Sequence, residues 1–225
     1  MTLGPHRRTL LALAAALTLA LPALAAPASS AQHATGLADD MSLGSPTAKV
    51  TVVEYASASC PHCARFNNDV LPAFKKKYVD TGRVRYVFRE FLTEPVQVAA
   101  AGFLLARCAG KARYFQVLDE FFHGQAHAYE TGDIKTLILS AGGKAGLDEK
   151  KIQACLSDKT SADALNERVQ RYASEDKVEF TPTFTVNGQK LPPLDHEVTL
   201  QDLDDAIQPV LNPARPGKGA KAGKS

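Results

Sequence analysis

The pattern of apolar and polar residues predicts two strands and a helix in the first half of the chain. Residues 49–55 form a β-branched run that contains an aromatic residue, which is typical of a strand. The next segment is predicted to be a helix, because apolar residues recur every four positions at Phe66, Val70, Phe74 and Tyr78. Pro72 should kink this helix without ending it, since the apolar stripe continues beyond it. Val84, Tyr86 and Phe88 recur at every second position among Arg83, Arg85 and Arg89 and predict a second strand. The order strand, helix, strand favours a parallel βαβ unit.

The second half of the chain begins with helical periodicity only. From about residue 94 to residue 176 five amphipathic segments follow one another with no strand pattern among them. Residues 180–186 then regain strand character, and Asn187-Gly188 is a strong signal for a hairpin turn. A last helix is predicted over about residues 200–210. We therefore expect a single α/β domain that is interrupted by an all-helical insertion.

The two ends of the chain have the composition of processing and terminal segments. A basic stretch, an apolar run at residues 10–21 and small residues near 25 are typical of a cleaved secretory signal peptide over residues 1–25. An uncleaved anchor is the alternative, although the run is shorter than the roughly 20 residues of a membrane span. Residues 26–40 should be a flexible leader, and residues 212–225 a disordered basic tail. The domain itself is predicted to cover residues 41–211.

Charge and cysteine content narrow the classes of function. The formal net charge of the 225 residues is only +2, which argues against nucleic-acid binding as the main function. The chain has four cysteines, and an even number in an exported protein favours thiols that form disulfides. Two of them, Cys60 and Cys63, lie two residues apart at the end of the first predicted strand.

The Cys60–Cys63 pair is interpreted as a redox-active dithiol. A structural zinc site needs a second close pair of ligands, which the chain lacks, so no metal is expected. A haem attachment site needs His after the second cysteine, where the chain has Ala64. A purely structural disulfide over so short a loop would constrain the unfolded chain little. At a helix N-terminus, by contrast, backbone N–H groups and the helix dipole stabilise a thiolate on Cys60.

The residues between the two cysteines support the same interpretation. Pro61 suits the first turn of a helix, where its missing N–H costs nothing. His62 is expected to place a donor or a positive charge beside the sulfur and so favour the thiolate. Cys63 lies one turn further into the helix and should be the shielded, resolving thiol. A stabilised thiolate makes the disulfide a better oxidant.

Two motifs and the helical block between them carry a resemblance to a known family. The segments "VVEYASASCPHCARF" and "TPTFTVNG" look like those of the DsbA family of bacterial thiol:disulfide oxidoreductases. The resemblance implies a thioredoxin-like fold with an inserted all-helical subdomain, and it covers essentially residues 41–211. The Cys-Pro-His-Cys tetrapeptide is typical of the oxidising members of the family.

The resemblance also implies roles for three residues outside the tetrapeptide. Thr181-Pro182 matches the loop with a cis-proline that lies against the active-site pair and offers backbone groups to a substrate peptide; an ordinary trans proline is the alternative. Glu54 matches an acidic residue beneath the site that relays a proton, with an exposed strand-end carboxylate as the alternative. Residues 56–59 are small where some relatives have bulkier aromatic residues, which leaves the hydrophobicity of the expected substrate groove open.

The remaining cysteines and one histidine pair have structural interpretations. Cys108 and Cys155 fall on apolar faces of two predicted helices, where two buried free thiols are possible. A disulfide between them is favoured in an oxidising compartment, and some family members resemble this arrangement. His123 and His127 are four residues apart, but the chain lacks the glutamate of a zincin motif, so a solvated or capping pair is expected.

Taken together, these patterns predict an exported enzyme that uses no cofactor. We expect a periplasmic monomer that introduces disulfides into unfolded or newly translocated proteins, with a membrane reoxidant of the DsbB type. The alternatives are an isomerase or reductase of the same fold, or a peptide-binding chaperone without redox activity.

Overall fold

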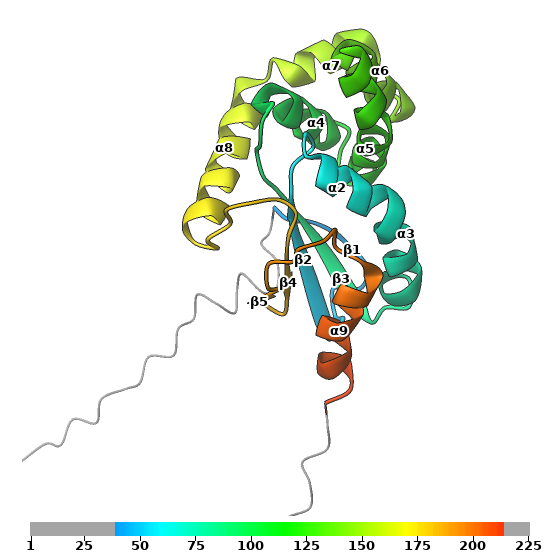
Figure 1. Ribbon diagram of the computed structural model, residues 1–225. Helices are drawn as coiled ribbons and strands as arrows, with labels where there is room; N and C mark the ends of the chain where they lie inside the picture. The colour runs from blue at the N-terminus through cyan, green and yellow to red at the C-terminus, as the bar shows by residue number, and fades with distance from the viewer. Residues whose placement is uncertain (1–38, 214–225) are drawn as a thin grey trace, which may run out of the picture.

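The structure, a computed structural model, describes residues 39–213 and is built around a five-stranded mixed sheet (Figure 1). The strand order is β1-β3-β2-β4-β5. The central strand β2 (Val50–Ala56) is buried along its whole length and pairs in parallel with β3 (Val84–Glu90). The short strand β1 (Met41–Leu43) pairs with β3 antiparallel and was not predicted from the sequence. Strand β4 (Thr183–Val186) pairs antiparallel with the other side of β2.

One long helical segment connects β2 to β3. It consists of α2 (Pro61–Arg65), the π-helical turn η1 (Phe66–Val70), α3 (Leu71–Phe74) and the π-helical turn η2 (Lys75–Val79). The helix passes through Pro72 without ending, as the apolar stripe predicts. The N–H of Leu71, just before the proline, bonds five residues back to the carbonyl of Phe66. The segment and the last helix, α9 (Leu200–Leu211), cover the same face of the sheet (Figure 1).

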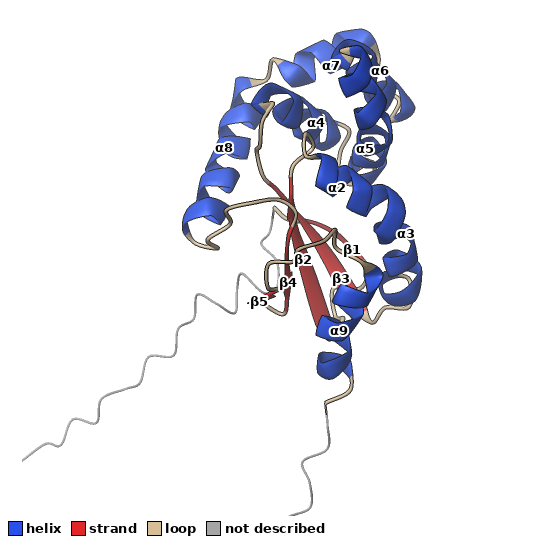
Figure 2. Ribbon diagram, in the orientation of Figure 1, coloured by secondary structure: helices blue, strands red, loops and turns tan. Residues whose placement is uncertain are grey.

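Five helices form the predicted insertion between β3 and β4 (Figure 2). They are α4 (Val96–Cys108), α5 (Tyr114–Thr131), α6 (Ile134–Lys144), α7 (Glu149–Leu156) and α8 (Lys159–Ser174). Their apolar faces continue the core of the sheet and the connecting helix without interruption. The prediction of an α/β domain with a helical insertion is confirmed.

Buried charges join the insertion to the sheet. At the end of β3, Glu90 accepts hydrogen bonds from Arg107 on α4 at 2.6 Å and Arg168 on α8 at 2.6 Å. Its neighbour Arg89 is fully buried and pairs with Asp40 at 3.0 Å and Asp176 at 3.1 Å. Removing one partner of such a pair would leave an uncompensated buried charge, so these contacts fix the insertion to the sheet.

The predicted hairpin is present between β4 and β5 (Gln189–Lys190). Asn187 and Gly188 both have positive φ angles, of 48° and 81°, as a tight two-residue turn between twisted strands requires.

The predicted end segments lie mostly outside the described residues. The signal peptide, the leader up to residue 38 and the tail from residue 214 fall there. Asp39 and Asp40, the last two residues of the segment expected to be a flexible leader, contact the folded domain. Asp40 is 7% exposed and bonded to Arg89, and Asp39 lies 3.6 Å from Arg171. A pattern of small residues could not reveal these long-range ion pairs.

Candidate active site

Cys60 lies at the junction between β2 and the connecting helix. It is the N-cap residue of α2, and its sulfur accepts a hydrogen bond from the backbone N–H of Cys63 at 3.4 Å. Pro61 occupies the first turn, where no backbone donor is lost. Cys60 is 6% exposed and Cys63 is fully buried, and both are free thiols in the structure. The first cysteine is thus the one that a second molecule can reach.

The two thiols have opposite electrostatic surroundings. The pKa of Cys60 is lowered from 9.0 to about 6, chiefly by a hydrogen bond from the Cys63 thiol. Burial opposes this shift, while Thr181 and the backbone N–H groups of Cys63 and His62 add to it. Burial, together with Cys60 and Glu54, raises the pKa of Cys63 well above its ordinary value. The arrangement therefore favours a thiolate on Cys60 and a thiol on Cys63.

The Thr181–Pro182 loop lies against this pair. The peptide bond between the two residues is cis, and the carbonyl oxygen of Thr181 is 3.4 Å from the sulfur of Cys60. The loop leads directly into β4, and the pairing of β4 with β2 brings the loop beside the connecting helix. Because this helix begins at the dithiol, it is also called the active-site helix.

Glu54 is buried beneath the dithiol and is not an exposed strand-end carboxylate. It is 2% exposed, lies in the middle of β2 and accepts a hydrogen bond from the hydroxyl of Tyr86. Burial raises its pKa from 4.5 to about 8, the bond from Tyr86 lowers it, and the charge of Cys60 raises it. A carboxyl group with such a pKa can hold or release a proton near neutral pH.

His62 is held by an ion cluster that the sequence does not indicate. Its Nδ1 is 2.7 Å from Oε1 of Glu197, which also accepts bonds from Arg65 at 2.8 and 2.5 Å. Burial opposes ionisation of Glu197, but the bonds from Arg65 and His62 lower its pKa overall. The imidazole that was expected beside the Cys60 sulfur is thus bonded to a carboxylate 135 residues further along the chain.

The small residues at 56–59 do not contribute to a substrate surface, contrary to the expectation from the sequence. Their exposed fractions are all at or below 1%. Helix α5 covers them: Gln125 donates to the carbonyl of Ala58 at 2.7 Å, and Tyr129 donates to that of Ser59 at 2.9 Å. A Cβ on Gly102 of α4 would lie only 2.7 Å from the Cβ of Ala58. Small side chains are needed here because two helices of the insertion approach this turn closely.

A groove of about 500 Å³ opens beside the dithiol. One wall is the cis-proline loop with Phe180, and the other is the segment 191–198. His62 and Glu197 lie at the end that adjoins the active-site helix. Phe180 is 50% exposed, so its apolar ring is accessible along this wall of the groove. Sequence reasoning missed Phe180 and Glu197, although the position of Phe180 next to Thr181-Pro182 was a usable signal.

The second cysteine pair lies on two helices of the insertion. Cys108, the last residue of α4, and Cys155 of α7 form a disulfide with a Cα–Cα distance of 5.9 Å. His123 bonds to the backbone carbonyl of Asp119 at 2.8 Å. Within residues 39–213, no group of three or more His, Cys, Asp or Glu side chains is arranged to hold a metal ion.

A mixed sheet of this order, a dithiol at the start of the following helix and a cis-proline loop against it define a dithiol protein of thioredoxin-like fold. The sequence model of the family described as Thioredoxin matches residues 37–209. The chain therefore belongs to the thioredoxin family.

Individual relatives point to one branch of that family. A Rickettsia bellii protein, provisionally named a protein-disulfide oxidoreductase, is 32% identical over 151 residues. The crystal structure of Wolbachia pipientis alpha-DsbA1 has a TM-score of 0.69 and 25% identity, covering 78% of this chain and 92% of that one. A thioredoxin-like oxidoreductase from Silicibacter pomeroyi has a TM-score of 0.59 and 27% identity, covering 81% and 96%. These matches confirm the resemblance to DsbA proteins.

The curated relative is longer than the matched region. The alignment covers 67% of this chain but 58% of the Rickettsia bellii protein. The chain thus spans less than two thirds of the length of this relative.

Proposed function

We propose that this protein is an exported thiol:disulfide oxidase that donates the Cys60–Cys63 disulfide to unfolded or newly translocated proteins. The observation that carries this proposal is the contrast between the two thiols, an acidic Cys60 at the entrance and a buried Cys63 behind it. Stabilising the thiolate favours the reduced dithiol, and this makes the corresponding disulfide a stronger oxidant.

The reaction follows from this geometry. A substrate thiolate attacks the sulfur of Cys60, the Cys60–Cys63 bond breaks, and its electron pair goes to the sulfur of Cys63. A second substrate thiolate then attacks the substrate sulfur of the mixed disulfide, and Cys60 leaves as a stabilised thiolate. The substrate loses two electrons and gains a disulfide, and the protein gains both electrons as a dithiol.

The groove supplies a place for the substrate chain. Its wall at Thr181-Pro182 borders Cys60, and the exposed ring of Phe180 offers apolar contact to residues beside the substrate cysteine. We propose Thr181, Pro182 and Glu54 as supporting residues, in substrate binding for the first two and in proton transfer for the third. The Cys108–Cys155 disulfide is proposed to be structural, because it joins two helices of the insertion and neither cysteine lines the groove.

The cellular setting is part of the same proposal. None of the helices within residues 39–213 is long and apolar enough to cross a membrane. The signal-peptide pattern of residues 1–25 and the even number of cysteines support export to the periplasm. The proposed oxidase is a monomer, and a DsbB-type membrane protein is its proposed reoxidant.

The direct test uses the oxidised protein and a reduced peptide that contains two cysteines. One equivalent of protein should convert one equivalent of peptide to its disulfide form, as resolved by mass spectrometry. Cys60→Ser should abolish the conversion. A chaperone that merely binds peptides would suppress aggregation equally well with Cys60→Ser, and that result without any oxidation would contradict the proposal.

A further inference from the structure

Tyr86 and Glu54 form a buried pair beneath the dithiol. In the register of the sheet, Glu54 lies opposite Phe88 and Tyr86 lies opposite Val52, so Tyr86 and Glu54 are diagonal neighbours on one face. This face is covered by the active-site helix. The two side chains are 1% and 2% exposed, and the hydroxyl of Tyr86 donates to Oε2 of Glu54.

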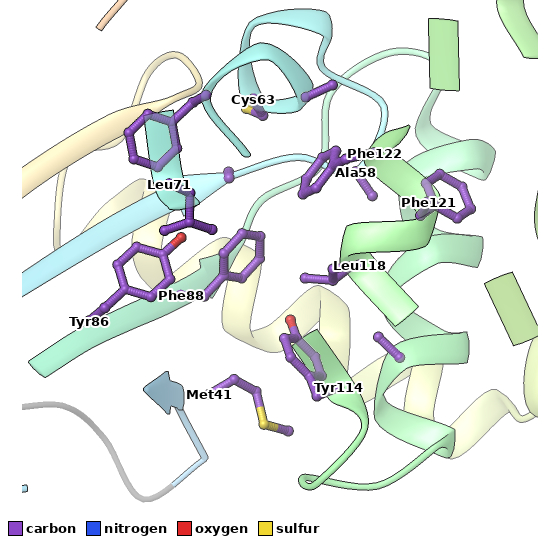
Figure 3. Close-up of a cluster of buried hydrophobic side chains, with 14 of the residues drawn as sticks. Met41, Ala58, Cys63, Leu71, Tyr86, Phe88, Tyr114, Leu118, Phe121 and Phe122 are labelled. Atoms are coloured by element: carbon purple, nitrogen blue, oxygen red, sulfur yellow. The ribbon is translucent and has the colours of Figure 1, made fainter. Parts of the chain in front are cut away.

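The position of Tyr86 in the core is set by its ring and not by its hydroxyl. The ring packs against Phe74 of the active-site helix at a centroid distance of 6.1 Å and against Phe115 of α5 at 6.1 Å. Figure 3 shows Tyr86 in the same buried cluster as Cys63, with its hydroxyl at the end of the ring nearer to that cysteine. An apolar ring alone would fill the space, so the hydroxyl calls for its own explanation.

We propose that Tyr86 is a positioning residue that holds the carboxyl group of Glu54 towards Cys63 and stabilises the carboxylate that remains after proton transfer. This inference rests on the proposed thiol:disulfide exchange and assigns a residue to its proton step. Neither the tetrapeptide nor the cis-proline motif indicates a role for Tyr86.

The proton step follows from the exchange reaction. When a substrate thiolate attacks Cys60, the electron pair of the broken disulfide goes to the sulfur of Cys63. This sulfur is fully buried, so a thiolate there is unfavourable and must take up a proton. The carboxyl group of Glu54 donates that proton and becomes a carboxylate, which the hydroxyl of Tyr86 stabilises through its hydrogen bond. Glu54 regains a proton from those that the two substrate thiols release when they ionise to thiolates.

The surrounding titratable groups explain why this bond matters. Glu54 faces Tyr86 on β3 and is coupled to Cys60 and Cys63 on the active-site helix, and Tyr114 of α5 is coupled to Tyr86 in turn. Burial and the charge of Cys60 both raise the pKa of Glu54, whereas the bond from Tyr86 lowers it to about 8. Without the hydroxyl, the carboxyl group would keep its proton too tightly to donate it efficiently near neutral pH.

The test is the titration of Glu54 in the oxidised protein, in which neither active-site cysteine can ionise. Selective isotope labelling and carbon NMR report the carboxyl group directly. In Tyr86→Phe the pKa of Glu54 should rise by about one pH unit, since a hydrogen bond to a charged group favours the charged form about tenfold or more. Tyr78→Phe is the matched control: this tyrosine is also fully buried, but its hydroxyl bonds to Asp204 and Gln208. It should leave the titration of Glu54 unchanged.

Two further measurements make the outcome decisive. In the wild-type protein, the ring carbon that bears the Tyr86 hydroxyl should change its chemical shift with the same midpoint as Glu54, a readout that needs no variant. In single-turnover peptide oxidation, Tyr86→Phe should move the pH profile upward, and this shift should vanish in a Glu54→Gln background. The inference would be overturned by an unchanged pKa of Glu54 in folded Tyr86→Phe. It would also be overturned if the chemical shift of the Tyr86 ring carbon did not change over the pH range in which Glu54 titrates. Both titrations are made without substrate, so they fail or succeed independently of the oxidase proposal.

Discussion

Replacing Glu54 by glutamine should stabilise the oxidised protein at alkaline pH and leave it little changed at acid pH. Glutamine has nearly the same shape and can still accept the hydrogen bond from Tyr86, but it carries no proton to lose. In the wild-type protein the buried carboxyl group must either keep its proton or bear a charge in an apolar setting. Burial is the main cause of the raised pKa, so the effect persists in the oxidised protein, which lacks only the smaller contribution from the charge of Cys60.

The magnitude follows from the shift of the Glu54 pKa from 4.5 to about 8. The folded state binds this proton more tightly than the unfolded state does. Its contribution to stability is therefore complete below pH 4.5 and is lost as the pH rises through 8. At about 1.4 kcal/mol per pH unit, the full difference is at most about 5 kcal/mol in the oxidised protein, where the charge of Cys60 is absent. The advantage of Glu54→Gln should grow over this window and become constant above it.

Urea unfolding of the two oxidised proteins at about pH 5 to about pH 9 would measure this difference in the free energy of unfolding. This range extends to both sides of the raised pKa that is typical of a buried glutamate. Glu167→Gln is the control, because Glu167 is exposed on α8 and its loss removes one charge without relieving burial. Parallel stability curves for wild type and Glu54→Gln across the whole range would refute the reasoning, since they would mean that Glu54 ionises as freely as in the unfolded chain.

Two other predictions concern the four cysteines. The Cys108–Cys155 disulfide closes a loop with a sequence separation of 47, and its removal in a double alanine variant should cost about 4 kcal/mol in the chain-entropy model. We expect calorimetry to show a melting temperature lower by about 8–16 °C with peptide oxidation retained, and lost activity at an unchanged melting temperature would contradict a structural role. In the reduced protein, the alkylation rate of Cys60 should reach half its maximum near pH 6, while Cys63 stays unreacted. A midpoint at the ordinary thiol pKa, about 8.5, would show that the site does not stabilise the thiolate.

The elements of the fold were predictable wherever one local pattern determined them. The β-branched run of β2, the four-residue stripe of the connecting helix and the Asn187-Gly188 turn each carry their own signal. Strand β1 has only three residues, too few to show a strand pattern, and it is defined by its antiparallel pairing with β3. Asp40 was assigned to the leader because its partner Arg89 lies 49 positions away.

The candidate site also contains some residues that a local motif indicates and others that depend on tertiary contacts. Cys60, Cys63 and Pro182 carry motifs that can be read directly, and the register of the two parallel strands would have placed Tyr86 beside Glu54. The bond between Glu197 and His62 spans 135 positions and has no local signal, so the orientation of the imidazole could not be predicted. The burial of Ala58 likewise depends on helices of the insertion, whose packing is a tertiary property.

The reduction potential of the Cys60–Cys63 pair, measured by equilibration in glutathione buffers, tests the central claim most directly. Lowering the pKa of Cys60 from 9.0 to about 6 stabilises the reduced form at pH 7. By itself this should raise the potential by about 30 mV over that of a dithiol with ordinary acidity. We predict a value clearly less negative than that of the reductant thioredoxin, which is about −270 mV. A value at or below that of thioredoxin would contradict the oxidase and identify the protein as a reductant.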